Sequence, residues 1–154
     1  IETIVLPREK DDTDTVYAAK EAMRRGYKDF LILGAIGQRL DHSLVNVYLL
    51  LLLKENGCKG MIADDYSEMC LLKNETADIE DSCSYFSLLA VNGPASGVAI
   101  KNAKFPLEDA VIEPSYQYAT SNEVLPGMTA FVTVNDGCLL LIKVRQISPN
   151  SSRY

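Results

Sequence analysis

A run at residues 31–42 combines an apolar segment with two glycines, an arginine and an aspartate. Gly34 and Gly37 allow a sharp turn and a close approach of the backbone to a ligand. Arg39 offers a planar fork of five donors that suits phosphate oxygens, and the helix predicted from Asp41 directs its first N–H groups to the same place. The pattern predicts a loop that holds phosphate, although an ordinary tight turn between a strand and a helix has the same composition.

The loop also carries two opposite charges, which limit the roles that it can have. Arg39 and Asp41 stand two residues apart between a predicted buried strand and a predicted buried helix, where unpaired charges are costly. We therefore expect them either to pair with each other or to contact a ligand and its metal. The loop is neither a Walker A motif nor G-x-G-x-x-G. His42, the single histidine, is favoured as a hydrogen-bonding cap or packing residue over a general acid or base.

A second cluster places three carboxylates and two hydroxyls within residues 11–15. Asp11 and Asp14 are three apart and lie on one face if a helix begins here. Clustered carboxylates repel one another unless a cation or a helix N-terminus compensates, and Mg²⁺ beside a phosphate is such a cation. The alternative is that Asp12 or Thr13 caps the helix.

A third candidate lies in the second half of the chain, at residues 116–122. Its tyrosines supply flat apolar faces, while Ser121 and Asn122 supply directional hydrogen bonds. That combination suits an aromatic heterocycle. A strand edge or a turn is the alternative interpretation.

The elements that position these groups follow from hydrophobic periodicity. Apolar residues at helical spacing predict a helix after residue 14 that Gly26 ends, and a second helix over residues 41–55. Short apolar runs predict strands at Thr3–Leu6, Asp29–Leu33 and Gly60–Ala63. The alternation of strands and helices is typical of a parallel sheet with covering helices.

After about Asp65 the helical periodicity ends and short β-prone runs follow. The turn signal Asn135-Asp-Gly137 between two apolar runs predicts a hairpin. We therefore predict an α/β part followed by an all-β part: a truncated parallel βαβαβ domain at residues 1–66 and a C-terminal antiparallel β-sandwich at residues 67–154. The predicted strands of the second part are Glu68–Lys73, Tyr85–Val91, Gly97–Asn102, Ala110–Glu113, Met128–Val134 and Cys138–Val144.

Composition limits the classes of partner. The chain has 154 residues and a formal net charge of −6, and without a Lys/Arg cluster this argues against nucleic acid as the main partner. The longest apolar run, residues 45–53, is too short to span a bilayer. The four cysteines are unevenly spaced, which argues against a zinc site and favours reduced thiols. No charged-then-apolar leader is present in this sequence, so we expect a cytoplasmic protein. The first residue is Ile1 rather than Met, from which we expect that the true N-terminus is missing.

Taken in order, three segments resemble the motifs of the thiamine pyrophosphokinase family, and the resemblance covers essentially the whole chain. They are Lys10-Asp-Asp-Thr-Asp-Thr15, the run 34–42 with Asn46 following, and Thr120-Ser-Asn-Glu123. The second is the most specific. Ile36 and Gln38 stand where the family usually carries Thr and Gly, which leaves the Arg and the Asp in place.

The resemblance implies transfer of pyrophosphate from ATP to the hydroxyl of thiamine with Mg²⁺, giving thiamine diphosphate and AMP. It also implies a homodimer whose active sites lie between subunits. The residues that it assigns are Asp14, Arg39 and Asp41 to catalysis, Asp11 and Asp14 to the metal, Thr13, Gly34, Gly37 and Arg39 to the nucleotide and its phosphates, and Ser121 and Asn122 to thiamine.

The family also carries an N-terminal segment with a Gly-Asp-x-Asp-Ser type motif, which does not appear in this sequence. We therefore expect these 154 residues alone to bind nucleotide poorly and not to turn over. Two alternatives remain open at this point. One is a non-catalytic module that binds thiamine or a nucleotide, and the other is a dimerisation module.

Overall fold

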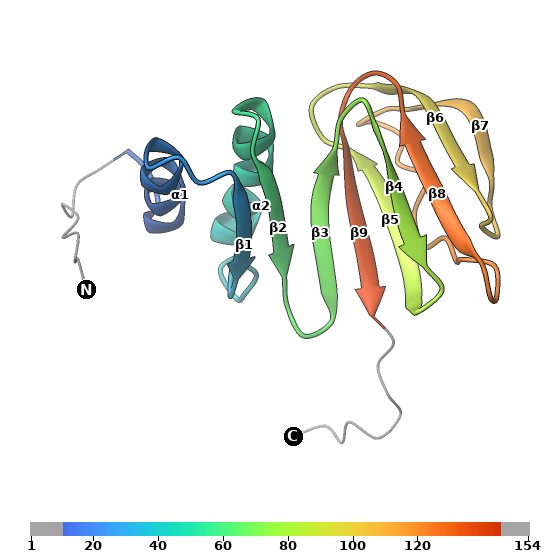
Figure 1. Cartoon of the computed structure of the whole chain (residues 1–154), viewed down its shortest axis with the longest axis horizontal. Helices are drawn as coiled ribbons and strands as arrows, with labels where there is room; N and C mark the ends of the chain where they lie inside the picture. Colours follow the sequence, from blue (N-terminus) through green and yellow to red (C-terminus); the bar gives the residue numbers. More distant parts are fainter. Residues whose placement is uncertain (1–10, 146–154) are drawn as a thin grey trace.

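The computed structural model describes residues 11–145. The predicted strand Thr3–Leu6 and the C-terminal tail therefore lie outside the described residues. Neither helix within this range is long and apolar enough to cross a membrane. The elements in chain order are α1 (Asp14–Arg24), β1 (Asp29–Leu33), α2 (Leu40–Glu55), β2 (Lys59–Ala63), β3 (Ser67–Leu72), β4 (Glu75–Glu80), β5 (Cys83–Ala90), β6 (Ala95–Lys101), β7 (Leu107–Ile112), β8 (Thr129–Val134) and β9 (Leu139–Arg145) (Figure 1).

One five-stranded sheet, which we call the long sheet, runs through both halves of the chain in the order β1-β2-β3-β9-β5 (Figure 1). β1 and β2 pair in parallel, as predicted for an α/β part. β3 then pairs antiparallel with β2, and β9 pairs antiparallel with both β3 and β5. The predicted division at residues 66 and 67 falls in the turn before β3, so hydrogen bonding continues across it.

A second, four-stranded sheet in the order β4-β8-β6-β7 packs on one face of β3, β9 and β5. Alternate residues of each strand point into the space between the sheets, as expected for a sandwich. This arrangement confirms the predicted fold class of an α/β part followed by antiparallel β structure. The largest fully buried side chains here are Phe86, Ile79, Leu88, Ile100, Ile112, Leu139, Leu141 and Val98.

The helices cover the opposite face of the long sheet. Leu50 of α2 packs with Ile62 of β2, Leu71 of β3 and Leu140 of β9. α1 packs against α2, with Ala19 next to the α2 leucines. The candidate phosphate loop at residues 34–39 therefore connects a strand, β1, with a helix, α2, and both elements pack against the core.

The predicted hairpin at residues 135–137 is wrong. β8 belongs to the four-stranded sheet, whereas β9 lies in the long sheet between β3 and β5. Asp136 continues the pairing with Ser96 of β6, and Gly137, at φ +85°, then turns so close to Pro94 that a Cβ would lie 2.4 Å from its carbonyl oxygen. Both flanking strands are apolar because each is central to its own sheet, and not because they pair with each other.

One strand, β4, was not predicted from the sequence. Its side chains alternate between exposed polar residues and inward positions, but Ile79 is its only large apolar residue and is completely buried. Pairing with β8, including a 2.8 Å contact between the hydroxyls of Thr76 and Thr133, stabilises it.

The four cysteines, at positions 58, 70, 83 and 138, are free thiols.

Candidate functional site

The glycine loop follows β1 directly and leads into α2. Gly34 has φ +67°, in the left-handed region that favours glycine. Gly37 is not among the residues with positive φ, and a Cβ built there meets no atom within 4 Å. The loop therefore needs a glycine at position 34 for its turn, while Gly37 leaves open space above the backbone. Of residues 34–40, Ala35 alone is buried.

Arg39 and Asp41 form a two-pronged ion pair with Nε–Oδ1 and Nη2–Oδ2 distances of 2.9 and 2.6 Å. The pairing between them is thus confirmed as one of the two predicted arrangements. The expectation of a buried setting is wrong, because the two side chains are 72% and 63% exposed. The hydrogen bonds from Arg39 hold the pKa of Asp41 well below its usual range, so the carboxylate is charged at neutral pH.

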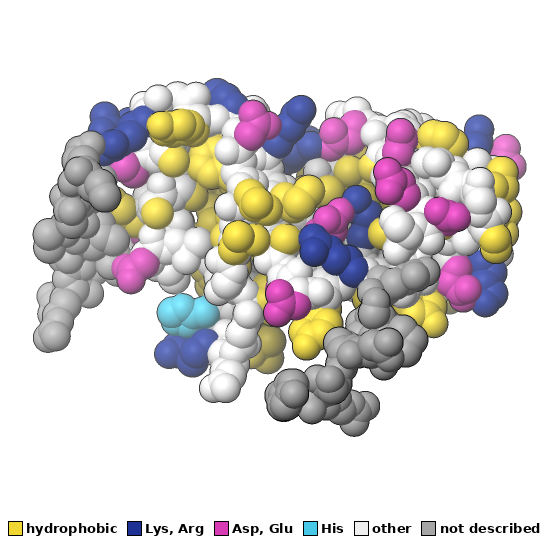
Figure 2. Space-filling view, turned by 60° about the horizontal axis from the view of Figure 1, so that its bottom comes forward, with side chains coloured by type: hydrophobic (Ala, Val, Ile, Leu, Met, Phe, Trp, Pro, Cys, Tyr) yellow, Lys and Arg dark blue, Asp and Glu magenta, His cyan; other side chains and the backbone are white. Residues whose placement is uncertain are grey.

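The start of α2 lies against this pair. Arg39 is the N-cap residue, but its side chain does not cap the free N–H groups of the helix. Asp41 places a negative charge in the first turn, where the helix dipole favours it. His42 is exposed at the same helix start (cyan in Figure 2). The helix start thus presents N–H groups, a guanidinium and a carboxylate together.

Two polar side chains of α2, those of Ser43 and Asn46, form hydrogen bonds to the backbone of the loop. The Ser43 hydroxyl lies 3.1 Å from the Gly37 nitrogen and 3.1 Å from the Arg39 carbonyl oxygen. The Asn46 Nδ2 donates to the Ala35 carbonyl at 2.8 Å. Neither residue was predicted to have a role, although Asn46 belongs to the segment that resembles the second family motif. The available signal was the position of Ser43 four residues after Arg39, from which a serine can bond back to the backbone.

At the start of α1, the structure confirms the capping alternative for Thr13, whose hydroxyl accepts from the Val16 N–H at 3.4 Å. Asp12 pairs with Lys20 at 2.7 Å. Asp11 and Asp14 are exposed. Across residues 11–145 no three His, Cys, Asp or Glu side chains gather as a metal cage, so the metal assignment of Asp11 and Asp14 stays a prediction.

The Ser-Asn element forms a strained turn beside β5. Ser121 is exposed at φ +55°, and its N–H donates to the Ser87 hydroxyl at 3.0 Å. Asn122 is only 2% exposed. Its Nδ2 donates to the Phe105 carbonyl at 2.8 Å, and its Oδ1 accepts from the N–H groups of Phe105 and Glu123. Asn122 thus holds the turn in place, and Ser121 is the side chain that faces solvent.

The segment before this turn covers the free edge of β5. The Gln117 amide exchanges two hydrogen bonds with the Ala90 backbone, in the way a neighbouring strand would. The Tyr118 hydroxyl donates to the Val111 carbonyl at 2.8 Å. Beside the segment lies an apolar hollow of about 250 Å³, lined by Ile100, Phe105, Leu107, Tyr118, Ala119, Thr120 and Asn122.

The loop and the Ser-Asn element lie at the same end of the long sheet but at opposite edges. A single row of directly paired residues joins them: Leu33, Ala63, Glu68, Lys143, Phe86 and Asn122. Five pairing steps of roughly 5 Å each make a separation of about 25 Å. Within one chain, the width of the long sheet therefore separates the end of β1 from the Ser-Asn turn.

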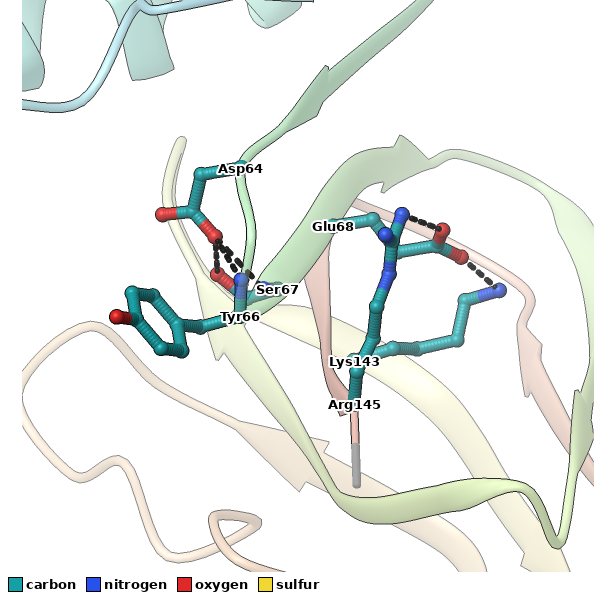
Figure 3. Close-up of polar contacts among 6 residues, drawn as sticks. All are labelled: Asp64, Tyr66, Ser67, Glu68, Lys143 and Arg145. Atoms are coloured by element: carbon teal, nitrogen blue, oxygen red, sulfur yellow. Dashed lines mark hydrogen bonds and ion pairs between the residues drawn. The ribbon is translucent and has the colours of Figure 1, made fainter. Parts of the chain in front are cut away.

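The middle of this row is occupied by ion pairs and a turn (Figure 3). Glu68 contacts Lys143 at 2.5 Å and Arg145 at 3.5 Å, and the hydrogen bond from Lys143 lowers the pKa of Glu68. The Asp64 carboxylate accepts from the N–H groups of Tyr66 and Ser67 at 2.8 and 2.7 Å, and these bonds shape the turn between β2 and β3. The surface between the glycine loop and the Ser-Asn element therefore consists of paired charges and a turn.

Comparison with known proteins identifies the two halves. Residues 1–62 match the family model described as "Thiamin pyrophosphokinase, catalytic domain". Residues 74–139 match the one described as "Thiamin pyrophosphokinase, vitamin B1 binding domain". The chain belongs to the thiamin pyrophosphokinase family. The glycine loop lies in the first matched range, and the Ser-Asn element lies in the second.

Solved thiamin pyrophosphokinases share the fold. The enzyme from Bacillus subtilis has a TM-score of 0.82 and 23% identity, covering 90% of this chain and 65% of its own. The one from Geobacillus thermodenitrificans has a TM-score of 0.78 and 26% identity, covering 92% and 66%. This chain thus spans slightly less than two thirds of either relative. No curated protein matches it significantly by sequence alone.

Proposed function

We propose that this chain contributes to the transfer of pyrophosphate from ATP to the hydroxyl of thiamine, giving thiamine diphosphate and AMP. The observation that carries the proposal is the Arg39–Asp41 pair, which stands preformed on a glycine loop at a helix start. Transfer of a phosphoryl group depends mainly on positioning and on neutralisation of charge. A guanidinium fixed beside a helix N-terminus supplies both.

The proposed phosphate site assigns a role to each residue of the loop. Arg39 contacts phosphate oxygens, and Asp41 orients its guanidinium through the two-pronged pair. The open space over Gly37 lets a phosphate reach the backbone, and Gly34 makes the turn. The resemblance assigns Thr13 to the nucleotide, and its hydroxyl caps α1 in the structure.

Mg²⁺ fits the donor set of this chain only in part. Asp11 and Asp14 would hold it with phosphate oxygens and water, the set of ligands that Mg²⁺ often takes in nucleotide sites. When bound, the ion would supply neutralisation of the phosphate charge. Asp41, already tied to Arg39, is assigned to orientation of that side chain.

The thiamine side is assigned to the hollow beside the Ser-Asn turn. Its volume of about 250 Å³ lies below the usual range for a whole ligand, so it suits one aromatic ring of a two-ring molecule. Ser121 contacts the substrate directly, and Asn122 supports the turn by its bonds to Phe105.

We further propose that the protein works as a homodimer. The separation of about 25 Å across five strands supports an arrangement in which the loop of one copy meets the turn of another. A cytoplasmic location is supported by the free thiols at all four cysteine positions, because reducing compartments keep such thiols unpaired.

The test is a calorimetric titration with thiamine diphosphate and Mg²⁺, a ligand that carries both groups to be recognised. Arg39→Ala is expected to weaken binding by about tenfold or more, since it removes a charged hydrogen-bond donor. Arg24→Ala is a matched control: Arg24 forms a similar two-pronged pair with Glu21 at the other end of α1 and is also 72% exposed.

Equal affinities of the R39A and R24A variants would overturn the proposed phosphate site. Binding of thiamine alone, with no gain from the diphosphate or from Mg²⁺, would favour the non-catalytic binding module. The lack of turnover expected of these residues alone stays a prediction, and the titration does not depend on it.

A further inference from the structure

Buried polar side chains are few in the part of the chain that the structure describes. Within residues 11–145 they are Ser43, Asn46 and Asn122. Burial of a polar group costs free energy unless the group is hydrogen-bonded, and each of these three is bonded to the backbone of a loop at the candidate site. Two of the three belong to one helix, α2, and hold one loop.

The bonds of Ser43 and Asn46 reach alternate residues of that loop. Asn46 holds the carbonyl of Ala35, and Ser43 bonds to Gly37 through its N–H and to Arg39 through its carbonyl. The side chains of the residues between them are exposed. The buried side of the loop is thus held by hydrogen bonds, and its solvent-facing side remains accessible.

Among residues 11–145, one apolar contact also fixes the start of the loop: Ala35 is buried and packs in the core with Leu50 of α2. Among the described residues, positions 34–38 make no hydrogen bond between backbone groups. The covalent connections to β1 and α2 set only the ends. Residues 36–39 have no buried side chain of their own, so the conformation that presents Arg39 and the helix start depends largely on Ser43 and Asn46, which need not touch a ligand.

We propose that Ser43 and Asn46 are positioning residues that hold the loop at residues 35–39 in the shape that receives phosphate. This inference rests on the proposed phosphate site for its purpose, but the clamp itself is a property of the free protein. Without it, the loop samples several conformations, and binding must first order it.

Two measurements test the clamp. The first is amide hydrogen exchange of Gly37 by NMR in the free protein. Because the Gly37 N–H donates to Ser43, Ser43→Ala is expected to raise its exchange rate by about tenfold, and Ser43→Thr, which keeps the hydroxyl, is expected to restore the protection. A purely structural role of Ser43 would not single out this one amide.

The second measurement is affinity for thiamine diphosphate with Mg²⁺. Asn46→Ala is compared with Asn56→Ala, because Asn56 also donates from Nδ2 to a backbone carbonyl of α2 at 2.8 Å but lies at the far end of the helix. We expect about tenfold weaker binding for N46A and for S43A, and wild-type affinity for N56A and S43T.

The outcomes separate the two proposals. Unchanged Gly37 exchange in S43A, or affinities of S43A and N46A equal to that of N56A, would overturn the clamp. If the wild-type protein does not bind the ligand but S43A still exposes the Gly37 amide, the clamp stands and the proposed phosphate site fails. Should N46A not fold, the S43A and S43T pair decides alone.

Discussion

Backbone conformation distinguishes the two glycines of the loop. Gly34 sits at φ +67°, where a Cβ is unfavourable, whereas Gly37 lies outside that region with open space around it. Gly34→Ala is expected to destabilise the protein by about 1–2 kcal/mol. Gly37→Ala is expected to change stability by less than about 0.5 kcal/mol but to weaken binding of thiamine diphosphate, because its methyl group fills the space above the loop. Urea unfolding and calorimetry measure the two effects.

Equal losses of stability in G34A and G37A would show that the loop has another conformation in solution.

The two glycines also illustrate what a glycine pattern in a sequence can and cannot indicate. Both glycines are visible in the sequence, and both suit a phosphate loop. Gly34 is needed for its positive φ and Gly37 for the space above it. Neither the dihedral angle nor the neighbouring atoms can be read from a single sequence.

At the scale of elements, the pairing of β3 with β9 brings Glu68 opposite Lys143. The hydrogen bond from Lys143 lowers the pKa of Glu68 below its ordinary value of 4.5, so the folded state holds fewer protons on this group than the unfolded state. The pair therefore stabilises the protein above pH 4.5, and this contribution is lost as the pH falls toward the lowered pKa.

Glu68→Gln is expected to lower stability at pH 7 by about 1 kcal/mol and to reduce the loss of stability on acidification below pH 4.5. Urea unfolding midpoints from pH 7 to pH 3 measure both effects. Glu123→Gln, which breaks the more exposed pair with Lys104, is the control and should follow the wild-type curve closely. A wild-type acid dependence in E68Q would contradict the assignment.

For the molecule as a whole, the width of the long sheet decides how a site can form. If the loop of one copy meets the turn of another, a variant damaged at each element can complement the other. Arg39→Ala and Thr120→Trp, which fills the mouth of the hollow, are each expected to weaken binding of thiamine diphosphate by about tenfold or more, so that intact sites fill first in a titration. After mixing and subunit exchange, about a quarter of the sites should be intact, because half of the dimers are mixed and each has one undamaged site.

Calorimetric stoichiometry measures the fraction of intact sites. Each variant mixed with itself is the control. No recovery in the mixture, although cross-linking shows mixed dimers, would contradict a site shared between copies. Sedimentation of the wild-type protein tests the dimer itself.

Local pattern was sufficient for much of this protein. The apolar spacing before Gly26 predicts α1, and the leucine-rich run after Asp41 predicts α2 to within one residue of its observed start. The loop with Arg39 and Asp41 is equally visible, because turns, helix starts and charged pairs two residues apart depend on neighbours in the chain. The resemblance to the family also rests on short segments, and the family models over residues 1–62 and 74–139 confirm it.

Long-range contacts set the rest. The sequence around Asn135 is compatible with a hairpin, but β8 and β9 join different sheets because each finds partners far along the chain. Likewise, the exposure of Arg39, the burial of Ser43 and Asn46, and the distance between the loop and the Ser-Asn turn depend on which strands become neighbours. Hydrophobic burial selects that arrangement across the whole molecule, and no local window of residues carries it.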